Sequence, residues 1–145
     1  MPTYLITTFV ILAVGGILNA GYLTYHEVRK KPLICPLDHD CSYVTQSKWS
    51  RVFGVRNEVL GLLFYLGNLS IMIVSLSAAH LAPELYFLLL VMNAGGFLFS
   101  LFLVWVQFFV LKDYCFYCMV SALISTLIFI NSIALFLARD NLIFL

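Results

Sequence analysis

Charged residues are scarce in this sequence. Of 145 residues, eight are Lys or Arg and seven are Asp or Glu, so that charged residues make up 10% of the chain. A soluble domain carries about 25% charged residues, because ionic side chains must coat much of its surface. The composition therefore excludes an ordinary water-soluble globule. The formal net charge of +1 also gives no basis for a nucleic-acid partner.

Several signatures of other chemistry are also missing. The sequence has no glycine-rich phosphate loop and no dinucleotide fingerprint. Met119 follows the second cysteine of Cys115-x2-Cys118, so the haem attachment motif C-x-x-C-H is absent. No serine triad or carboxylate pair stands out. We expect no metal site, and we interpret Asp38-His39-Asp40 as a solvated loop tip and not as a metal-binding cluster.

Long hydrophobic runs dominate the chain instead. Hydrophobic residues make up 63% of the sequence, and four runs without a charged residue extend over 21 to 27 residues each. A hydrocarbon core about 30 Å thick needs roughly 20 helical residues, and these runs lack the alternation of β-barrel strands. They predict an all-α membrane protein, a single membrane domain over residues 1–145 with helices over 4–25, 58–79, 84–111 and 114–138.

The connections between these helices are short, with one exception. Residues 80–83 and Lys112-Asp113 leave room only for tight turns, which force neighbouring helices to run antiparallel. The prediction is a four-transmembrane-helix up-down bundle with one extramembrane loop over residues 26–57. Within this loop, residues 48–53 mix basic and aromatic side chains, which fits either an interfacial helix or a solvated loop.

Small and polar residues inside the runs predict close helix contacts. Gly16 and Ala20 are four residues apart, as are Gly96 and Ser100, and this spacing lets membrane helices approach closely. Ordinary use of small residues explains the spacing equally well. Four polar residues lie inside the runs, and we expect interhelical hydrogen bonds from them: Asn19, Asn68, Asn93 and Gln107.

Four cysteines stand in two closely spaced pairs. Cys35 and Cys41 lie in the long loop, and Cys115 and Cys118 lie where the fourth helix begins. In an antiparallel bundle these two regions share one membrane face. A helix N-terminus favours the thiolate, which is the attacking form of a cysteine. The pattern favours two redox-active pairs in series, with structural disulfides or a four-cysteine zinc site as alternatives.

Redox chemistry in a membrane needs an electron acceptor. The haem and dinucleotide motifs are absent from this sequence. The remaining candidate is a lipid-soluble quinone, bound inside the bundle beside the start of the fourth helix. If the cysteines are instead only structural, the chain is a small membrane binding or scaffold protein.

Three segments resemble the vitamin K epoxide reductase family. They are Cys41–Gly54 in the loop, Asn57–Tyr65 at the entry of the second helix, and Phe108–Cys118 around the C-x2-C motif. The resemblance implies a four-helix bundle around a quinone of the ubiquinone or menaquinone type. It also implies that the C-x2-C pair reduces the quinone, while the loop pair receives electrons from a thioredoxin-like partner.

The resemblance also implies roles for individual residues. By carry-over, Cys118 faces the quinone, Cys115 exchanges with Cys41, and Cys35 meets the partner protein. Asn57 matches a family asparagine that hydrogen-bonds a quinone carbonyl. From its position alone, Asn57 could equally serve as the N-cap of the second helix.

Further matches concern the walls of the quinone pocket. Phe64, Leu103 and Leu111 match pocket-lining positions, and Trp49 matches a residue of the loop that covers the pocket. Vertebrate members carry a tyrosine that contacts the other quinone oxygen, where this chain has Ala122. This departure puts epoxide reduction in doubt and suits a plain respiratory quinone.

Partner and location follow from the same reasoning. The chain ends at Leu145 without a thioredoxin-like domain, so we expect the partner to be a separate protein. We expect a multi-pass protein of the plasma (inner) membrane, embedded in the lipid bilayer. The basic residues concentrate on the cysteine side, which the positive-inside rule places in the cytoplasm. Disulfides persist outside the cytoplasm, and we expect the cysteines on the periplasmic or extracellular side.

Overall fold

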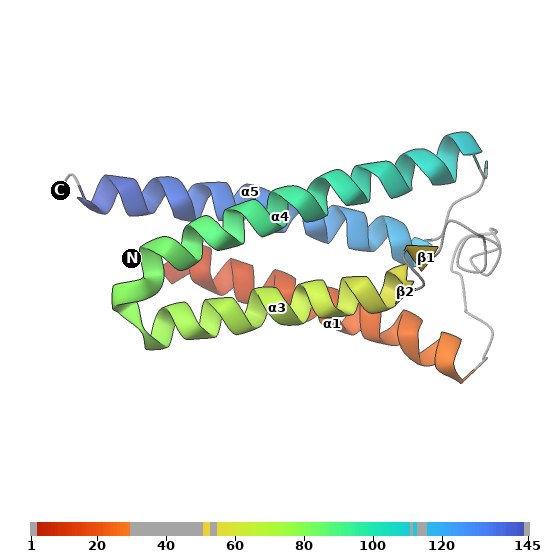
Figure 1. Cartoon of the computed structure of the whole chain (residues 1–145), viewed down its shortest axis with the longest axis horizontal. Helices are drawn as coiled ribbons and strands as arrows, with labels where there is room; N and C mark the ends of the chain where they lie inside the picture. Colours follow the sequence, from red (N-terminus) through yellow and green to blue (C-terminus); the bar gives the residue numbers. More distant parts are fainter. Residues whose placement is uncertain (1–2, 30–50, 53–54, 111, 113–115, 144–145) are drawn as a thin grey trace.

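Four long helices run side by side along the molecule (Figure 1). The structure is a computed structural model that describes residues 3–29, 51–52, 55–110, 112 and 116–143. The helices are α1 (Thr3–Val28), α3 (Asn57–Ser77), α4 (Ala82–Trp105) and α5 (Phe116–Ile143). Each contains a segment long and apolar enough to cross a membrane. The predicted all-α, four-span, up-down bundle is therefore confirmed, while the cysteine-bearing part of the long loop lies outside the described residues.

Several helix ends differ from the predicted ones. α1 continues to Val28 and α5 to Ile143, past the predicted ends at residues 25 and 138. Charged residues end the apolar run, but they do not end the backbone hydrogen bonding, which continues into the polar region beyond the hydrocarbon core. At the other end of the molecule, α3 stops at Ser77, and a single 3₁₀ turn, η2 (Ala79–Leu81), leads into α4.

α4 does not end as a regular helix. It continues as a π-helical segment, η3 (Val106–Val110), whose first two residues are buried. Beyond it, Lys112 has a φ of 54°, a left-handed conformation that few residues other than glycine adopt. π-helical turns are rare and are often found at functional sites. The connection from α4 to α5 therefore needs an irregular backbone on both sides of residue 111.

A short hairpin precedes α3. β1 (Arg51–Val52) pairs antiparallel with β2 (Val55–Arg56), so that Arg51 stands opposite Arg56. An interfacial helix over residues 48–53 is therefore wrong at Arg51 and Val52, because these residues satisfy their backbone groups across the hairpin. The rest of that segment lies outside the described residues. The hairpin leads directly into the first turn of α3.

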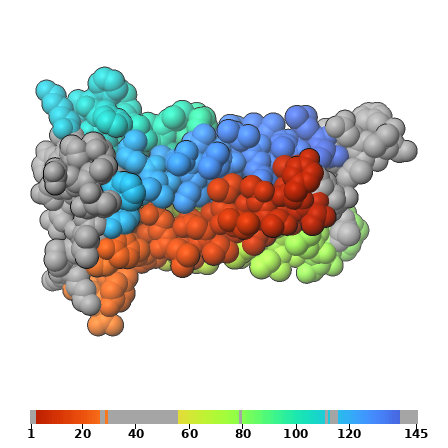
Figure 2. Space-filling view, turned by 180° about the vertical axis from the view of Figure 1, so that it is seen from behind, coloured from red at the N-terminus to blue at the C-terminus, as the bar shows by residue number. Residues whose placement is uncertain are grey.

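The helices pack unequally around the bundle axis. α1 packs along both α3 and α5, α4 packs mainly against α5, and the contact between α3 and α4 is less extensive. Figure 2 shows α1 and α5 lying side by side along one face of the molecule. The largest buried apolar side chains are Tyr65, Phe9, Met72, Leu89 and Ile128. α1 thus links α3 to the pair formed by α4 and α5.

Small residues provide the close contacts that their spacing predicts. Gly16 of α1 lies against the ring of Tyr65. Gly96 of α4 lies against the ring of Phe64, where an added Cβ would be 2.6 Å from a ring carbon. Neither position can hold a larger side chain without moving the ring. The close-approach interpretation of Gly16 and Gly96 is therefore confirmed.

Buried polar residues link the helices in the interior. Asn93 of α4 donates from Nδ2 to Asn68 Oδ1 of α3 at 2.8 Å and to Ser132 Oγ of α5 at 2.9 Å. All three side chains are buried. Interhelical hydrogen bonding by Asn68 and Asn93 is therefore confirmed. Gln107 donates to the carbonyl oxygen of Leu103 in the preceding turn at 3.4 Å.

Candidate redox site

Half of the predicted site residues lie in the part of the chain that the structure describes. These are Cys118, Asn57, Phe64, Leu103 and Ala122. The other predicted site residues lie outside the described residues, and they are Cys35, Cys41, Cys115, Trp49 and Leu111.

Cys118 lies in the first turn of α5. It is the third residue of the helix as described, after Phe116 and Tyr117, and its side chain is partly buried. Ala122 follows four residues later and is also partly buried, so both side chains share one face of α5. The thiol of Cys118 and the methyl group of Ala122 therefore lie one helical turn apart on α5.

Asn57 is the first residue of α3. The N-cap position belongs to Arg56, so the interpretation of Asn57 as the N-cap is wrong. The Oδ1 atom of Asn57 is buried. The two residues that flank Asn57 form an ion pair. Arg56 Nε donates to Glu58 Oε1 at 2.7 Å, and the Glu58 side chain is only 5% exposed. This ion pair fixes the start of α3 around Asn57.

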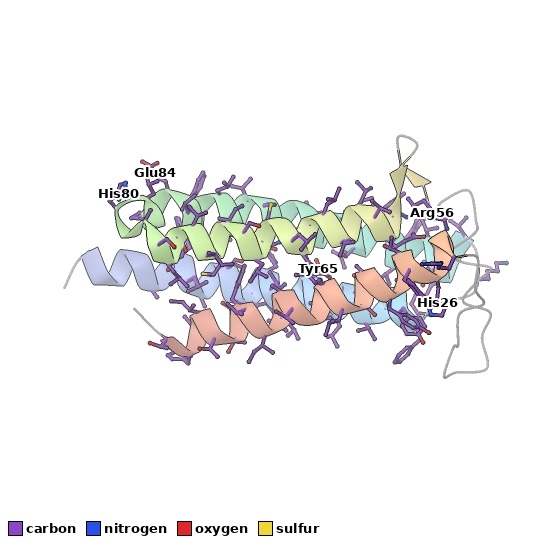
Figure 3. All side chains as sticks on the ribbon, turned by 90° about the horizontal axis from the view of Figure 1, so that it is seen from below. His26, Arg56, Tyr65, His80 and Glu84 are labelled. Carbon is purple, nitrogen blue, oxygen red and sulfur yellow. The ribbon has the colours of Figure 1, made fainter. Side chains whose placement is uncertain are left out.

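The same end of the bundle holds the starts of both α3 and α5 (Figure 1). Figure 3 shows His26 and Arg56 at this end, with His80 and Glu84 at the opposite end. The C-terminal end of α1, after which the long loop begins in the sequence, also lies at this end (Figure 1). The structure therefore brings Asn57 and Cys118 to the end of the bundle where the long loop begins, as chain order predicts.

The two remaining predicted site residues are Phe64 of α3 and Leu103 of α4. Phe64 stands seven residues after Asn57, on the same face of α3, and is partly buried. Its ring contacts Gly96 and meets the ring of Tyr65 edge to face, with 5.2 Å between centroids. Leu103 is partly buried in the last turn of α4, directly before η3. The predicted residues therefore come from three helices.

Two contacts near Cys118 have backbone acceptors that the sequence does not mark. Asn19 of α1 donates from Nδ2 to the carbonyl oxygen of Tyr117 at 2.9 Å. Tyr65 of α3 donates from its hydroxyl to the carbonyl oxygen of Ser121 at 2.9 Å. The sequence marks Asn19 as a polar residue inside a span, and its interhelical bond is confirmed. Neither Tyr117 nor Ser121 carried a signal as an acceptor, because every residue has a backbone carbonyl.

The comparison with known families can now be added to this geometry. A family model described as the vitamin K epoxide reductase family matches residues 7–133. The chain belongs to the vitamin K epoxide reductase family. The matched range includes most of α1, all of α3 and α4, and the first part of α5 with Cys118. Membership in the vitamin K epoxide reductase family supports a membrane oxidoreductase that works between thiols and quinones.

Proposed function

We propose that this protein is a membrane thiol:quinone oxidoreductase that drives disulfide bond formation. Electrons pass from the dithiol of a separate thioredoxin-like protein to Cys35 and Cys41. They continue to Cys115 and Cys118, and then to a quinone of the ubiquinone or menaquinone type. The observation that carries the proposal is the position of Cys118 in the first turn of α5, at the end of the bundle where α3 begins with Asn57.

The described residues have the chemistry that a quinone needs. A quinone is flat and apolar, with two carbonyl oxygens that accept hydrogen bonds. Asn57 can donate such a bond from its amide, and Phe64 offers an aromatic ring two turns further along the same face of α3. Cys118 supplies the reducing thiol. A bound quinone would provide a two-electron acceptor that remains soluble in the bilayer.

Each transfer between two cysteine pairs is a thiol–disulfide exchange. A thiolate attacks one sulfur of a disulfide, a mixed disulfide forms, and the second thiolate of the attacking pair resolves it. In the last step, the dithiol of Cys115 and Cys118 loses two electrons and two protons and becomes a disulfide. The quinone gains both and becomes a quinol. No external reductant or proton donor is needed beyond the partner dithiol.

Ala122 narrows the choice of quinone substrate. Vertebrate members of the family have a tyrosine at this position, and its hydroxyl contacts the second quinone oxygen. An alanine methyl group cannot donate a hydrogen bond. We therefore propose a plain respiratory quinone as the substrate.

Quinone-dependent oxidation of a dithiol tests the activity. Purified protein in detergent is mixed with a reduced thioredoxin-like protein and a short-chain ubiquinone or menaquinone, and quinol formation is followed by absorbance. We expect dithiol loss and quinol gain in equal amounts, and no turnover by Cys118→Ser. A folded wild-type protein that shows no quinone-dependent oxidation would contradict the proposal and leave the cysteines as structural.

A trapped intermediate tests the proposed order of the cysteines. In Cys118→Ser, no thiolate remains within the C-x2-C motif to displace Cys41 from Cys115. A disulfide between Cys41 and Cys115 should therefore accumulate, and peptide mapping under non-reducing conditions would detect it. The order is wrong if this variant contains only the disulfide between Cys35 and Cys41.

A further inference from the structure

The turn of α5 that carries Cys118 is hydrogen-bonded to two other helices. Just before Cys118, the carbonyl oxygen of Tyr117 accepts a hydrogen bond from Asn19 Nδ2 of α1 at 2.9 Å. Just after it, the Ser121 carbonyl oxygen accepts a hydrogen bond from the Tyr65 hydroxyl of α3 at 2.9 Å. The Tyr65 oxygen also lies 3.0 Å from the Ser121 hydroxyl oxygen. These contacts bracket Cys118 within about one helical turn.

The side chain of Tyr117 is held by α1 as well. The ring centroid of Tyr117 lies 4.9 Å from that of Tyr22, and the Tyr22 centroid lies 4.2 Å from that of His26. Asn19, Tyr22 and His26 are spaced by three and four residues, so they share one face of α1. Both the backbone and the ring of Tyr117, a residue inside the C-x2-C motif, are thus fixed by one helix.

Tyr65 reaches α5 because α1 leaves space for its ring. Gly16 lies directly against the Tyr65 ring, and any side chain there would collide with it. Gly16 is three residues from Asn19, on the same side of α1. Tyr65 is 1% exposed, and a buried phenol hydroxyl needs a hydrogen-bond partner. α1 therefore supplies one bond to the Cys118 turn directly and makes room for the other.

The start of a helix is the part that most needs such support. Its first four N–H groups have no partner within the helix, and helix ends fray. Only two described residues of α5 precede Cys118. A shift of about 1 Å in a reacting group can lower a rate about a hundredfold. A redox cysteine at this position therefore depends on contacts from outside its own helix.

We propose that Asn19 and Tyr65 are positioning residues that hold the first turn of α5 around Cys118. Both act through the backbone of α5. The inference rests on the proposed function only in taking Cys118 as a redox-active residue. Removing either hydrogen bond lets this turn fray, so Cys118 becomes more accessible to reagents and less well aligned for electron transfer.

Alkylation of Cys118 tests the positioning directly. Cys35, Cys41 and Cys115 are changed to serine, and the rate of reaction of Cys118 with N-ethylmaleimide is measured in detergent. Asn19→Leu keeps the branched shape but cannot donate, and Tyr65→Phe keeps the ring against Gly16 but lacks the hydroxyl. We expect alkylation about threefold to tenfold faster in each, the range for loss of one hydrogen bond.

Matched variants separate local fraying from loosening of the whole bundle. Thr24→Val in α1 removes a hydroxyl that bonds to Ala20 O of the same helix, so it should leave the rate unchanged. A second reporter protein carries Ser75→Cys as its single cysteine, with Cys118 also changed to serine. Ser75 is buried near the C-terminal end of α3, so its alkylation reports on loosening of the bundle far from Cys118. Equal acceleration at the reporter, or no acceleration of Cys118 beyond Thr24→Val, overturns the proposal.

Steady-state kinetics with all native cysteines provide the second readout. Asn19→Leu should lower kcat for quinone reduction about threefold to tenfold, while KM for the quinone stays unchanged. A raised KM with unchanged kcat would place Asn19 in substrate binding and overturn the positioning role. If the wild-type protein reduces no quinone, the proposed function fails, and the alkylation rates still decide whether Asn19 and Tyr65 hold the turn.

Discussion

We propose that Asn57 is the residue that donates a hydrogen bond from its amide nitrogen to a quinone carbonyl. It stands in the first turn of α3, outside the N-cap position, with its Oδ1 atom buried. Arg56 occupies the N-cap position and makes no side-chain capping bond. The N-cap alternative for Asn57 is thus wrong, and its contact with a quinone stays a proposal.

Replacing Asn57 should weaken quinone turnover and spare the fold. Asn57→Ala would remove the proposed hydrogen bond to the quinone, so we expect kcat/KM for the quinone to fall by a factor that corresponds to about 1–2 kcal/mol. Asn57→Asp should be equally impaired, because a carboxylate cannot donate. An acidic residue in the first turn also suits the helix dipole, so α3 should remain stable. Steady-state quinone reduction measures the effect.

Dithiol exchange is the control for this prediction. Both Asn57 variants should still exchange with a reduced thioredoxin-like protein at the wild-type rate, because exchange requires only the cysteines. Wild-type quinone kinetics in either variant would show that the amide does not contact the quinone.

At the scale of helices, glycines decide how closely α1 and α3 approach. Gly16 is the point on α1 where the Tyr65 ring crosses toward α5. Gly21, five residues further along α1, has no atom of a neighbouring helix within 4 Å of the position that a Cβ would take. The two glycines therefore differ in their surroundings, although both belong to the same apolar helix.

Alanine at these two positions should have opposite effects. Gly16→Ala forces the Tyr65 ring to move, so we expect the free energy of unfolding to fall by about 1–3 kcal/mol, as for other overpacked cores. Gly21→Ala should leave stability unchanged or slightly raised, because alanine is the better helix former. Thermal unfolding in the same detergent compares the two variants. Equal melting temperatures would mean that α1 and α3 are not held together at Gly16.

For the whole molecule, charge and redox chemistry give opposite orientations. At the cysteine end, Arg29 and Lys112 are exposed, and Arg56 is paired with Glu58. The positive-inside rule places this end in the cytoplasm, whereas stable disulfide chemistry places it outside. We therefore propose that the cysteine end faces the periplasm or the cell exterior.

Labelling of intact cells decides the orientation. After mild reduction, a membrane-impermeant maleimide should label a variant that keeps only Cys41. It should fail to label a variant that carries only His80→Cys, because His80 is exposed at the opposite end of the bundle (Figure 3). The reverse pattern would place the cysteines in the cytoplasm, as in organisms that form disulfides there.

Hydrophobic length alone determined the spans and their alternating direction. Each uncharged run is long enough to cross a bilayer, and a backbone in lipid must satisfy its own hydrogen bonds, so helices were the expected outcome. Chain order then placed the start of α5 at the same end as the long loop. The sequence also identified the family through motifs spread over most of the chain.

Which faces of the helices point inward was decided only by the tertiary structure. Leu66, Ile73 and Leu76 of α3 face outward, while Asn68 and Ser75 of the same helix are buried. Lipid is as apolar as a protein core, so the apolar pattern does not distinguish the two faces.

Contacts between particular atoms depend on this packing as well. The Tyr65 ring passes Gly16 to reach Ser121, and Asn19 meets the carbonyl of Tyr117. The acceptors are backbone carbonyls, which have no signature in the sequence. Only the packing of α1 against both α3 and α5 selects which carbonyls these side chains reach.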